Sequence, residues 1–296
     1  MESSQFQYTR THFKEEDFIL HGLHSNGVYE IKFHNLKKRN ASTGATTKRL
    51  IQIFQSMNQN DAVKVIVMHG GSYFSSGNDI SVFATAFTGG NMEKGLSEAK
   101  EGATVSMVAC LTAIIDLEKP LICLVSGGAH GIGCTITGLS DFIYCTPDAV
   151  FKTPFMSSYQ SPEGGSTITF PQQLGRRLAA EVLLTDRPLT AVEALKVGYI
   201  NGIVDQSVLI DNAMFYDLNK IPIISRLLQN DLKTMMNAKK LLNIGMNRGH
   251  MVECFKREGE ALFDIWKSPE FLPNMMKFIH NNSQKKKKIS NEQPKL

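Results

Sequence analysis

One glutamate in a loop of small residues and two glycine-rich turns are the parts of this sequence that could carry out chemistry. The glutamate is Glu163, in the run Ser-Pro-Glu-Gly-Gly-Ser that spans residues 161–166. Apolar and aromatic residues flank this run, namely Phe155, Met156, Tyr159 and Phe170. A carboxyl group in a partly dry pocket has a raised pKa and can act as a general base. An ordinary solvated glutamate is the alternative interpretation.

The two turns each place small residues directly after an apolar run. The first is Phe-Ser-Ser-Gly-Asn-Asp-Ile at residues 74–80, and the second is Ser-Gly-Gly-Ala-His-Gly-Ile-Gly at residues 126–133. If a helix follows each turn, its first backbone N–H groups have no partner inside the helix and can receive an anion. Glycine lets a ligand approach the backbone because no Cβ is in the way. Simple tight turns are the alternative for either one alone.

Several other kinds of site lack the residues that they would need. The sequence has no G-x-x-x-x-G-K-[ST] phosphate loop, and Gly131-x-Gly133 continues to Ile136 where a dinucleotide fingerprint needs a third glycine. The G-x-S-x-G turn of a serine hydrolase is also missing. His21 and His24 have no acidic or thiol ligands at metal spacing, so we expect a surface pair and no metal site.

Short apolar runs that alternate with helical patterns must position these residues. Strands are expected at residues 27–33, 62–68, 121–126 and 141–145, and near residues 202–205. The second and third are almost continuously apolar, as in strands buried on both faces. The alternation predicts an α/β fold with a mostly parallel sheet.

Helices are expected between and after the strands. Within residues 98–117, four apolar side chains recur at helical spacing: Val105, Val108, Leu111 and Ile115. A capping box of Thr190 and Glu193 begins a short helix, which Gly198 can end. From about residue 207 the pattern indicates helices alone, with apolar positions at Leu227, Met235, Leu242, Met246, Cys254, Leu262 and Trp266.

Composition and charge limit the class of protein. Of the 296 residues, 42% are hydrophobic and 20% are charged, which excludes collagen-like and wholly disordered chains. The net charge is +4, and Lys285–Lys288 alone supply four positive charges, so the rest of the chain is neutral. A neutral body argues against a nucleic-acid-binding surface. The apolar runs are too short for a membrane span.

The cysteines and the C-terminal residues indicate the cellular compartment of the protein. Five cysteines (Cys110, Cys123, Cys134, Cys145 and Cys254) form no C-x-x-C pair, which predicts buried, reduced thiols in an intracellular protein. From residue 281 the sequence is polar and lysine-rich, so we expect a flexible segment. It ends in Pro294-Lys295-Leu296, a variant of the S-K-L peroxisomal address. We therefore expect localisation in the peroxisome matrix, with the import receptor as a partner.

These residues together resemble the crotonase (enoyl-CoA hydratase/isomerase) superfamily. The resemblance covers most of residues 20–270 and is carried by residues 65–80, 119–144 and 154–205. Within the superfamily, the S-P-E-G run followed by F-P, and the S-S-G-N-D run before them, are most similar to peroxisomal Δ3,Δ2-enoyl-CoA isomerases. The resemblance implies a core built as a spiral of β-β-α turns. It also implies C-terminal helices that assemble trimers or hexamers.

The resemblance further implies roles for particular residues. The backbone amides of Asn78 and Ile132 would form an oxyanion hole, and Glu163 would be the base. The CoA and acyl groups would be bound by Ser75, Ser76, Gly77, Asn78, Asp79 and Ile80, together with Gly131 and Phe155. The two glutamates of the family's hydratases fall at Thr135 and Phe155 of this chain, which favours isomerisation over hydration.

The expected function is therefore to move the double bond of a 3-enoyl-CoA to the trans-2 position in β-oxidation of unsaturated fatty acids. Glu163 would carry a proton from C2 to C4 while the two amides hold the enolate. No cofactor is expected, because coenzyme A is part of the substrate. A hydratase with a displaced water-activating group and a non-catalytic acyl-CoA-binding protein are the alternatives.

Four regions are expected along the chain. Residues 1–20 would form an N-terminal extension, and residues 21–206 the spiral core that binds the thioester and carries out catalysis. Residues 207–280 would form a helical region for oligomerisation. Residues 281–296 would form the flexible basic tail that carries the targeting signal.

Overall fold

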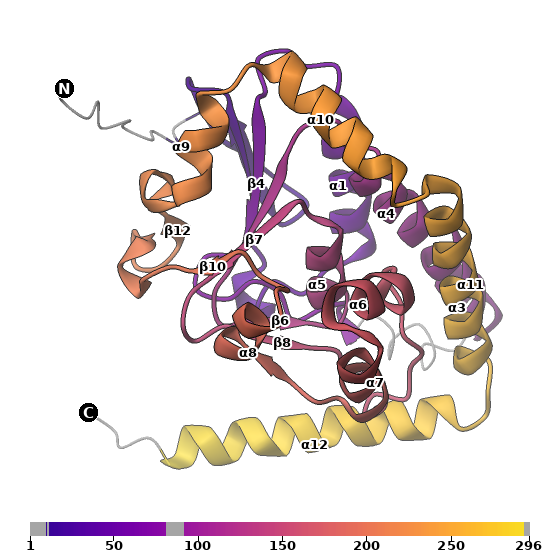
Figure 1. The fold of residues 1–296 in the computed structure, drawn as a ribbon. Helices are drawn as coiled ribbons and strands as arrows, with labels where there is room; N and C mark the ends of the chain where they lie inside the picture. Colours follow the sequence, from indigo (N-terminus) through magenta and orange to yellow (C-terminus); the bar gives the residue numbers. More distant parts are fainter. Residues whose placement is uncertain (1–9, 11, 81–91, 293–296) are drawn as a thin grey trace.

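A central sheet organises the molecule, as the computed structural model of residues 10, 12–80 and 92–292 shows (Figure 1). In this described part the sheet has seven strands, in the order β1-β2-β3-β4-β5-β7-β10. They are Lys14–Glu16 (β1), Ile19–Leu23 (β2), Val28–Phe33 (β3), Val65–His69 (β4), Leu121–Val125 (β5), Phe142–Cys145 (β7) and Gly202–Ile203 (β10). Pairing is antiparallel from β1 to β3 and parallel from β3 to β10. The five predicted strands and the parallel sheet are confirmed.

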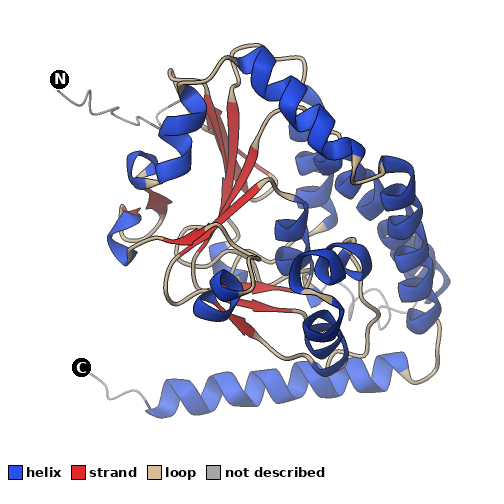
Figure 2. Ribbon diagram, in the orientation of Figure 1, coloured by secondary structure: helices blue, strands red, loops and turns tan. Residues whose placement is uncertain are grey.

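The middle strands form because their residues are apolar on both faces. All residues of β4 and β5 are buried. Ile66 and Met68 face one hydrophobic cluster, whereas Val65 and Val67 face another on the opposite side of the sheet. Both faces are covered by helices, as expected for a parallel sheet (Figure 2). The predicted α/β class is confirmed.

The helices lie between and after the strands along the chain and surround the central sheet (Figure 1). They are Gly44–Met57 (α1), Met92–Glu101 (α3), Met107–Ile115 (α4), Ile132–Thr135 (α5), Ser166–Leu174 (α6), Arg176–Thr185 (α7), Ala191–Lys196 (α8), Pro222–Leu228 (α9), Leu232–Ile244 (α10), Arg248–Trp266 (α11) and Phe271–Glu292 (α12). Short 3₁₀ turns occupy Leu36–Lys38, Ile136–Leu139, Gln206–Val208 and Leu218–Lys220. Helices α1, α4 and α11 stack on one side of the sheet, and α9 contacts the other. The predicted capping box of Thr190 and Glu193 is present at the start of α8.

A π-helical turn, Gly102–Ser106, separates α3 from α4. The sequence predicted one helix with a single apolar face across this region. Val108, Leu111 and Ile115 are buried as predicted, but Val105 is 57% exposed. A π turn inserts an extra residue and rotates the helix that follows, so Val105 falls on a different face. Such turns are frequent at functional sites, and this one lines the cavity described below.

Two small sheets lie beside the central one. Strands Gly128–His130 (β6), Val150–Lys152 (β8) and Leu189–Thr190 (β9) form the first. The second is a hairpin of Leu209–Ile210 (β11) and Phe215–Tyr216 (β12), so the prediction of helices alone after residue 207 is wrong. Asp211, Asn212 and Ala213 have positive φ, which reverses the chain within three residues and makes the hairpin possible.

Two predicted region boundaries are also wrong. Strand β1 and the start of β2 lie within residues 1–20, so this segment is part of the central sheet. Helix α12 continues through residue 281 to Glu292, where a flexible segment was expected. Between Pro273 and Pro294 the sequence has neither glycine nor proline, so nothing in it interrupts the helix. Residues 293–296, which include the predicted targeting signal, lie outside the described residues.

His21 and His24 are not the surface pair that was expected. Both are buried, and Nε2 of His24 lies 2.7 Å from Oε2 of Glu30. The other carboxylate oxygen of Glu30 lies 2.8 Å from Nε2 of His69. The five cysteines are buried with free thiols, as predicted. Among the described residues, no helix is long and apolar enough to cross a membrane, and no group of His, Cys, Asp or Glu is arranged to hold a metal ion.

Candidate active site

The two glycine-rich turns lie against each other. Ser75 N–H donates to the carbonyl of Gly128 at 3.1 Å, and His130 N–H donates to the carbonyl of Ser75 at 2.9 Å. The backbones of Gly77 and Gly131 then meet, because a Cβ on Gly77 would lie 2.8 Å from the His130 oxygen and 3.6 Å from the Gly131 Cα. Both glycines have positive φ, at +88° and +53°. A side chain at position 77 would prevent this close approach.

Each turn includes a backbone amide at a predicted site position that has no acceptor among the described residues. Ser42 bridges the first turn by donating to the Gly77 carbonyl and accepting from Asp79 N–H, each at 2.8 Å, and this leaves the N–H of Asn78 free. Ile132 is the first residue of α5, where an amide has no partner inside the helix. Among the described residues, neither amide donates a hydrogen bond. Two free donors on touching turns can receive one developing negative charge.

The loop that carries Glu163 packs against the second turn. Gly164 and Gly165 have φ of +73° and +77°, so the chain reverses before α6 begins at Ser166. A Cβ on Gly164 would lie only 2.0 Å from Oγ1 of Thr135 and 3.1 Å from Cδ1 of Ile132. The backbone next to Glu163 therefore touches α5, the helix that supplies the free Ile132 amide.

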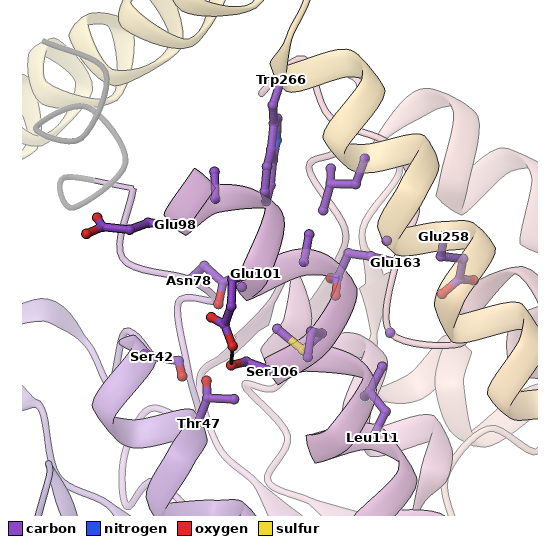
Figure 3. Close-up of a pocket in the computed structure, with 18 of the residues that line it drawn as sticks. Ser42, Thr47, Asn78, Glu98, Glu101, Ser106, Leu111, Glu163, Glu258 and Trp266 are labelled. Atoms are coloured by element: carbon purple, nitrogen blue, oxygen red, sulfur yellow. Dashed lines mark hydrogen bonds between the residues drawn. The ribbon is translucent and has the colours of Figure 1, made fainter. Parts of the chain in front are cut away.

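A cavity of about 320 Å³ is lined by both the first turn and the loop of Glu163. Figure 3 shows Asn78 and Glu163 in its wall, with Trp266 and Leu111 at opposite ends. Part of the wall is apolar, from α3, α4 and α11: Ala99, Met107, Leu111, Phe255, Leu262 and Trp266. The charged side chains on the wall are all acidic: Asp79, Glu98, Glu101, Glu163 and Glu258. This shape and lining suit an apolar chain with a polar group at one end.

Glu163 is held in a form that binds a proton readily. The residue is 5% exposed, and its Oε2 atom has no hydrogen-bond partner among the described residues. Burial raises the pKa of Glu163 to about 8, the negative charge of Glu258 adds to the rise, and the Thr135 hydroxyl opposes it. A carboxylate with a pKa near the working pH can take up a proton and release it again.

The structure brings only some of the predicted site residues to the cavity. Asn78, Asp79 and Glu163 line it. Ser75 and Ile132 line a smaller adjoining cavity of about 30 Å³, which shares Ser42, Thr47 and Met107 with the large one. The remaining predicted residues lie in or beside the turns, at Ser76, Gly77, Ile80 and Gly131.

Phe155 was expected to contact substrate, and the structure places it elsewhere. Its side chain is 2% exposed and belongs to the hydrophobic core, and it lines neither cavity in the described part of the chain. Phe170, also expected beside Glu163, is a core residue too. Phe83 and Phe87, which could line an acyl channel, lie outside the described residues.

The contribution of α11 to this cavity was missed. Phe255, Glu258, Leu262 and Trp266 all face it, whereas the sequence assigned this helix to oligomerisation. The spacing of residues along α11 could have indicated this contribution. Glu258 lies four residues after Cys254 and four before Leu262, on the apolar face of the helix. A carboxylate on a buried helical face calls for a partner, and here the partner is the loop of Glu163.

Comparison with known proteins adds independent information. Residues 24–262 match the family described as enoyl-CoA hydratase/isomerase. Enoyl-CoA delta isomerase 2 of Rattus norvegicus is 35% identical over 181 residues, which are 61% of this chain and 45% of that protein. Testis-specific chromodomain protein Y 1 of Homo sapiens is 28% identical over 253 residues, or 82% of this chain and 43% of that protein. This chain therefore spans slightly less than half the length of these two relatives.

A solved structure shows the same fold. The enoyl-CoA hydratase/isomerase from Pseudoalteromonas atlantica superposes with a TM-score of 0.75 and 23% sequence identity, covering 89% of this chain and 97% of that one. The predicted type of core is thereby confirmed.

Proposed function

Because this chain belongs to the enoyl-CoA hydratase/isomerase family, we propose that it is a Δ3,Δ2-enoyl-CoA isomerase. The observation that carries the proposal is the buried carboxylate of Glu163, whose Oε2 has no hydrogen-bond partner among the described residues and which lies in the wall of the cavity that Asn78 also lines. The positions that resemble the hydratase glutamates hold Thr135 and Phe155, and neither can activate water as a carboxylate does. A single base suits a reaction that only relocates a proton.

In this proposal the thioester binds with its carbonyl oxygen between the amides of Asn78 and Ile132. Removal of a proton from C2 places negative charge on that oxygen, and the two N–H groups stabilise the charge where it develops. Each such donor contributes about 3–4 kcal/mol to the transition state. The apolar wall of the cavity receives the acyl chain and keeps water from the enolate.

Glu163 then moves one proton between two carbons. Its carboxylate takes a proton from C2, the C2–H electron pair forms a C1–C2 double bond, and the carbonyl π electrons move onto the oxygen of the resulting dienolate. When the oxygen restores the carbonyl, the C1–C2 π electrons form the C2–C3 double bond, and the old C3–C4 π electrons take the proton back from the Glu163 carboxylic acid at C4. No atom is gained or lost, and no cofactor enters these steps.

The coenzyme A group is proposed to lie along residues 75–80. Three exposed basic residues, Lys37, Lys38 and Arg39, end beside this segment, because Ser76 N–H donates to the Arg39 carbonyl at 2.9 Å. Lys38 Nζ also lies 2.6 Å from the Asp79 carboxylate. Positive charge beside the first turn suits the phosphates of coenzyme A.

A product analysis tests this function. The purified protein is offered 3-enoyl-CoAs of graded chain length, and the product is identified by mass spectrometry and by its absorbance. The proposal expects trans-2-enoyl-CoA of unchanged mass. A product heavier by one water, formed from a 2-enoyl-CoA, would make the protein a hydratase. Binding without turnover would leave the non-catalytic alternative.

Assembly and localisation are part of the same proposal. A trimer or hexamer is proposed from the family alone, and sedimentation tests it. Localisation in the peroxisome and binding to its import receptor stay predictions. They depend on Pro294–Leu296, which lie outside the described residues. A fluorescent fusion without these three residues should be cytosolic, and punctate staining would contradict the prediction.

A further inference from the structure

Glu258 of α11 holds the loop that carries Glu163. Its Oε2 accepts a hydrogen bond from Gly165 N–H at 2.7 Å. Its Oε1 accepts from Thr167 N–H at 3.0 Å and from the Thr167 hydroxyl at 2.6 Å. Glu258 is 6% exposed and lines the same cavity as Glu163, as Figure 3 shows.

These contacts replace a cap that α6 lacks. The residue before the helix is Gly165, which has no side chain to accept a hydrogen bond from the first turn. Glu258 supplies that acceptor from a helix 93 residues further along the chain. Because Ser166 Oγ also donates to the Glu163 carbonyl at 2.8 Å, the backbone is fixed on the C-terminal side of Glu163. The direction of the Glu163 side chain therefore depends on α11.

The charge of Glu258 acts on Glu163 as well. The groups that act on Glu163 are Glu258 from α11 and Cys134 and Thr135 from α5. The wall of the same cavity also carries the acidic residues Asp79, Glu98 and Glu101. No Lys, Arg or His lies in the described part of that wall, although Lys38 Nζ, outside it, lies 2.6 Å from the Asp79 carboxylate. Burial raises the pKa of Glu258, and the three hydrogen bonds that its carboxylate accepts from Gly165 and Thr167 oppose that rise.

We propose that Glu258 is a positioning residue for the isomerase reaction, which aims the Glu163 carboxylate through Gly165 and Thr167 and places a second negative charge near it. The inference rests on the proposed function. The second charge makes the ionised form of Glu163 less favourable, so it contributes to the raised pKa of the base. A base with a higher pKa takes a proton from C2 with a larger driving force.

The test compares Glu258→Gln and Glu258→Ala with wild type in pH profiles of kcat/KM. Gln removes the charge and keeps one acceptor oxygen, so the acidic limb should move to lower pH by about one unit. Ala removes the acceptors too, so kcat should also fall about 10–100-fold while KM changes little. The matched control is Glu260→Gln, which removes the same charge from an exposed position on the same helix. Its profile should equal that of wild type.

A second readout does not depend on turnover. In protein labelled with ¹³C-glutamate at the carboxyl carbon, the Glu163 signal is identified by its loss in Glu163→Gln and is titrated in both backgrounds. The inference expects a lower titration midpoint in Glu258→Gln. Equal midpoints, or equal acidic limbs and equal kcat in all Glu258 variants, would overturn it. If wild type lacks isomerase activity while the midpoint still moves, the proposed function fails and the electrostatic role of Glu258 stands.

Discussion

Replacement of Glu163 by Gln lowers kcat for 3-enoyl-CoA by about 10²–10⁴-fold. The amide has nearly the same size and remains in the cavity wall, but it cannot take a proton from C2. Because the thioester would contact the Asn78 and Ile132 amides and the apolar wall, KM should change little. Initial rates and equilibrium binding of a saturated acyl-CoA measure the two effects separately. Unchanged turnover would remove Glu163 from the mechanism.

The same variant should be more stable than wild type at high pH. Folding raises the pKa of Glu163 from its ordinary value of 4.5 to about 8. A raised pKa means that the folded state favours the protonated group, so this stability is present at pH 4 and is lost as the pH rises through 8. Gln has no charge to bury, so its advantage should be absent at pH 4 and on the order of 5 kcal/mol at pH 9, because each pKa unit between 4.5 and 8 corresponds to about 1.4 kcal/mol. Denaturant unfolding at both pH values measures it, with Glu260→Gln as the control.

Gly164→Ala is expected to damage the site through its backbone. Position 164 has φ of +73°, and the new Cβ would lie 2.0 Å from Oγ1 and 2.7 Å from Cβ of Thr135. Thr135 is fully buried, so either the loop or α5 must move. A displacement of about 1 Å between base and substrate can lower kcat about 10²-fold. The clash should also reduce the free energy of unfolding by about 1–3 kcal/mol.

Gly198→Ala is the matched control for this variant. Gly198 has nearly the same φ, +77°, but a Cβ there meets no atom within 4 Å. Its substitution introduces the strain of a left-handed residue, about 1–2 kcal/mol, without the clash. Wild-type kcat in Gly198→Ala and a large loss in Gly164→Ala would attribute the loss to contact with α5. Equal kcat in the two variants would show that this contact does not position Glu163.

The strands were predictable because their signal is local. The runs that became β4 and β5 are apolar on both faces, and such runs have few alternatives to a buried strand. The π turn at Gly102–Ser106 has no comparable signal, because it depends on how α3 meets α11. Gly259 approaches the Ala103 carbonyl so closely that a Cβ would lie 2.5 Å from it. Contacts of this kind join residues that are far apart in the sequence, so no short run of residues predicts them.

The candidate site likewise has parts that the sequence predicted and parts that it did not. Glycine-rich turns after buried strands and a glutamate between proline and glycine could be recognised from the sequence, and the structure brings both turns and the Glu163 loop together. Phe155 was misplaced because an aromatic residue near a loop suits a core as well as a channel. The part played by α11 was missed because pairing of Glu258 with Gly165 and Thr167 needs the folded chain.

Transfer of deuterium within the substrate tests the central claim most directly. The protein converts a 3-enoyl-CoA that carries deuterium at both C2 positions, in ordinary water, and the product is analysed at early times by mass spectrometry and NMR. Since a buried carboxylic acid exchanges slowly with solvent, a measurable fraction of the product should carry deuterium at C4. A product whose C4 gains hydrogen from water alone would contradict a proton shuttle by Glu163.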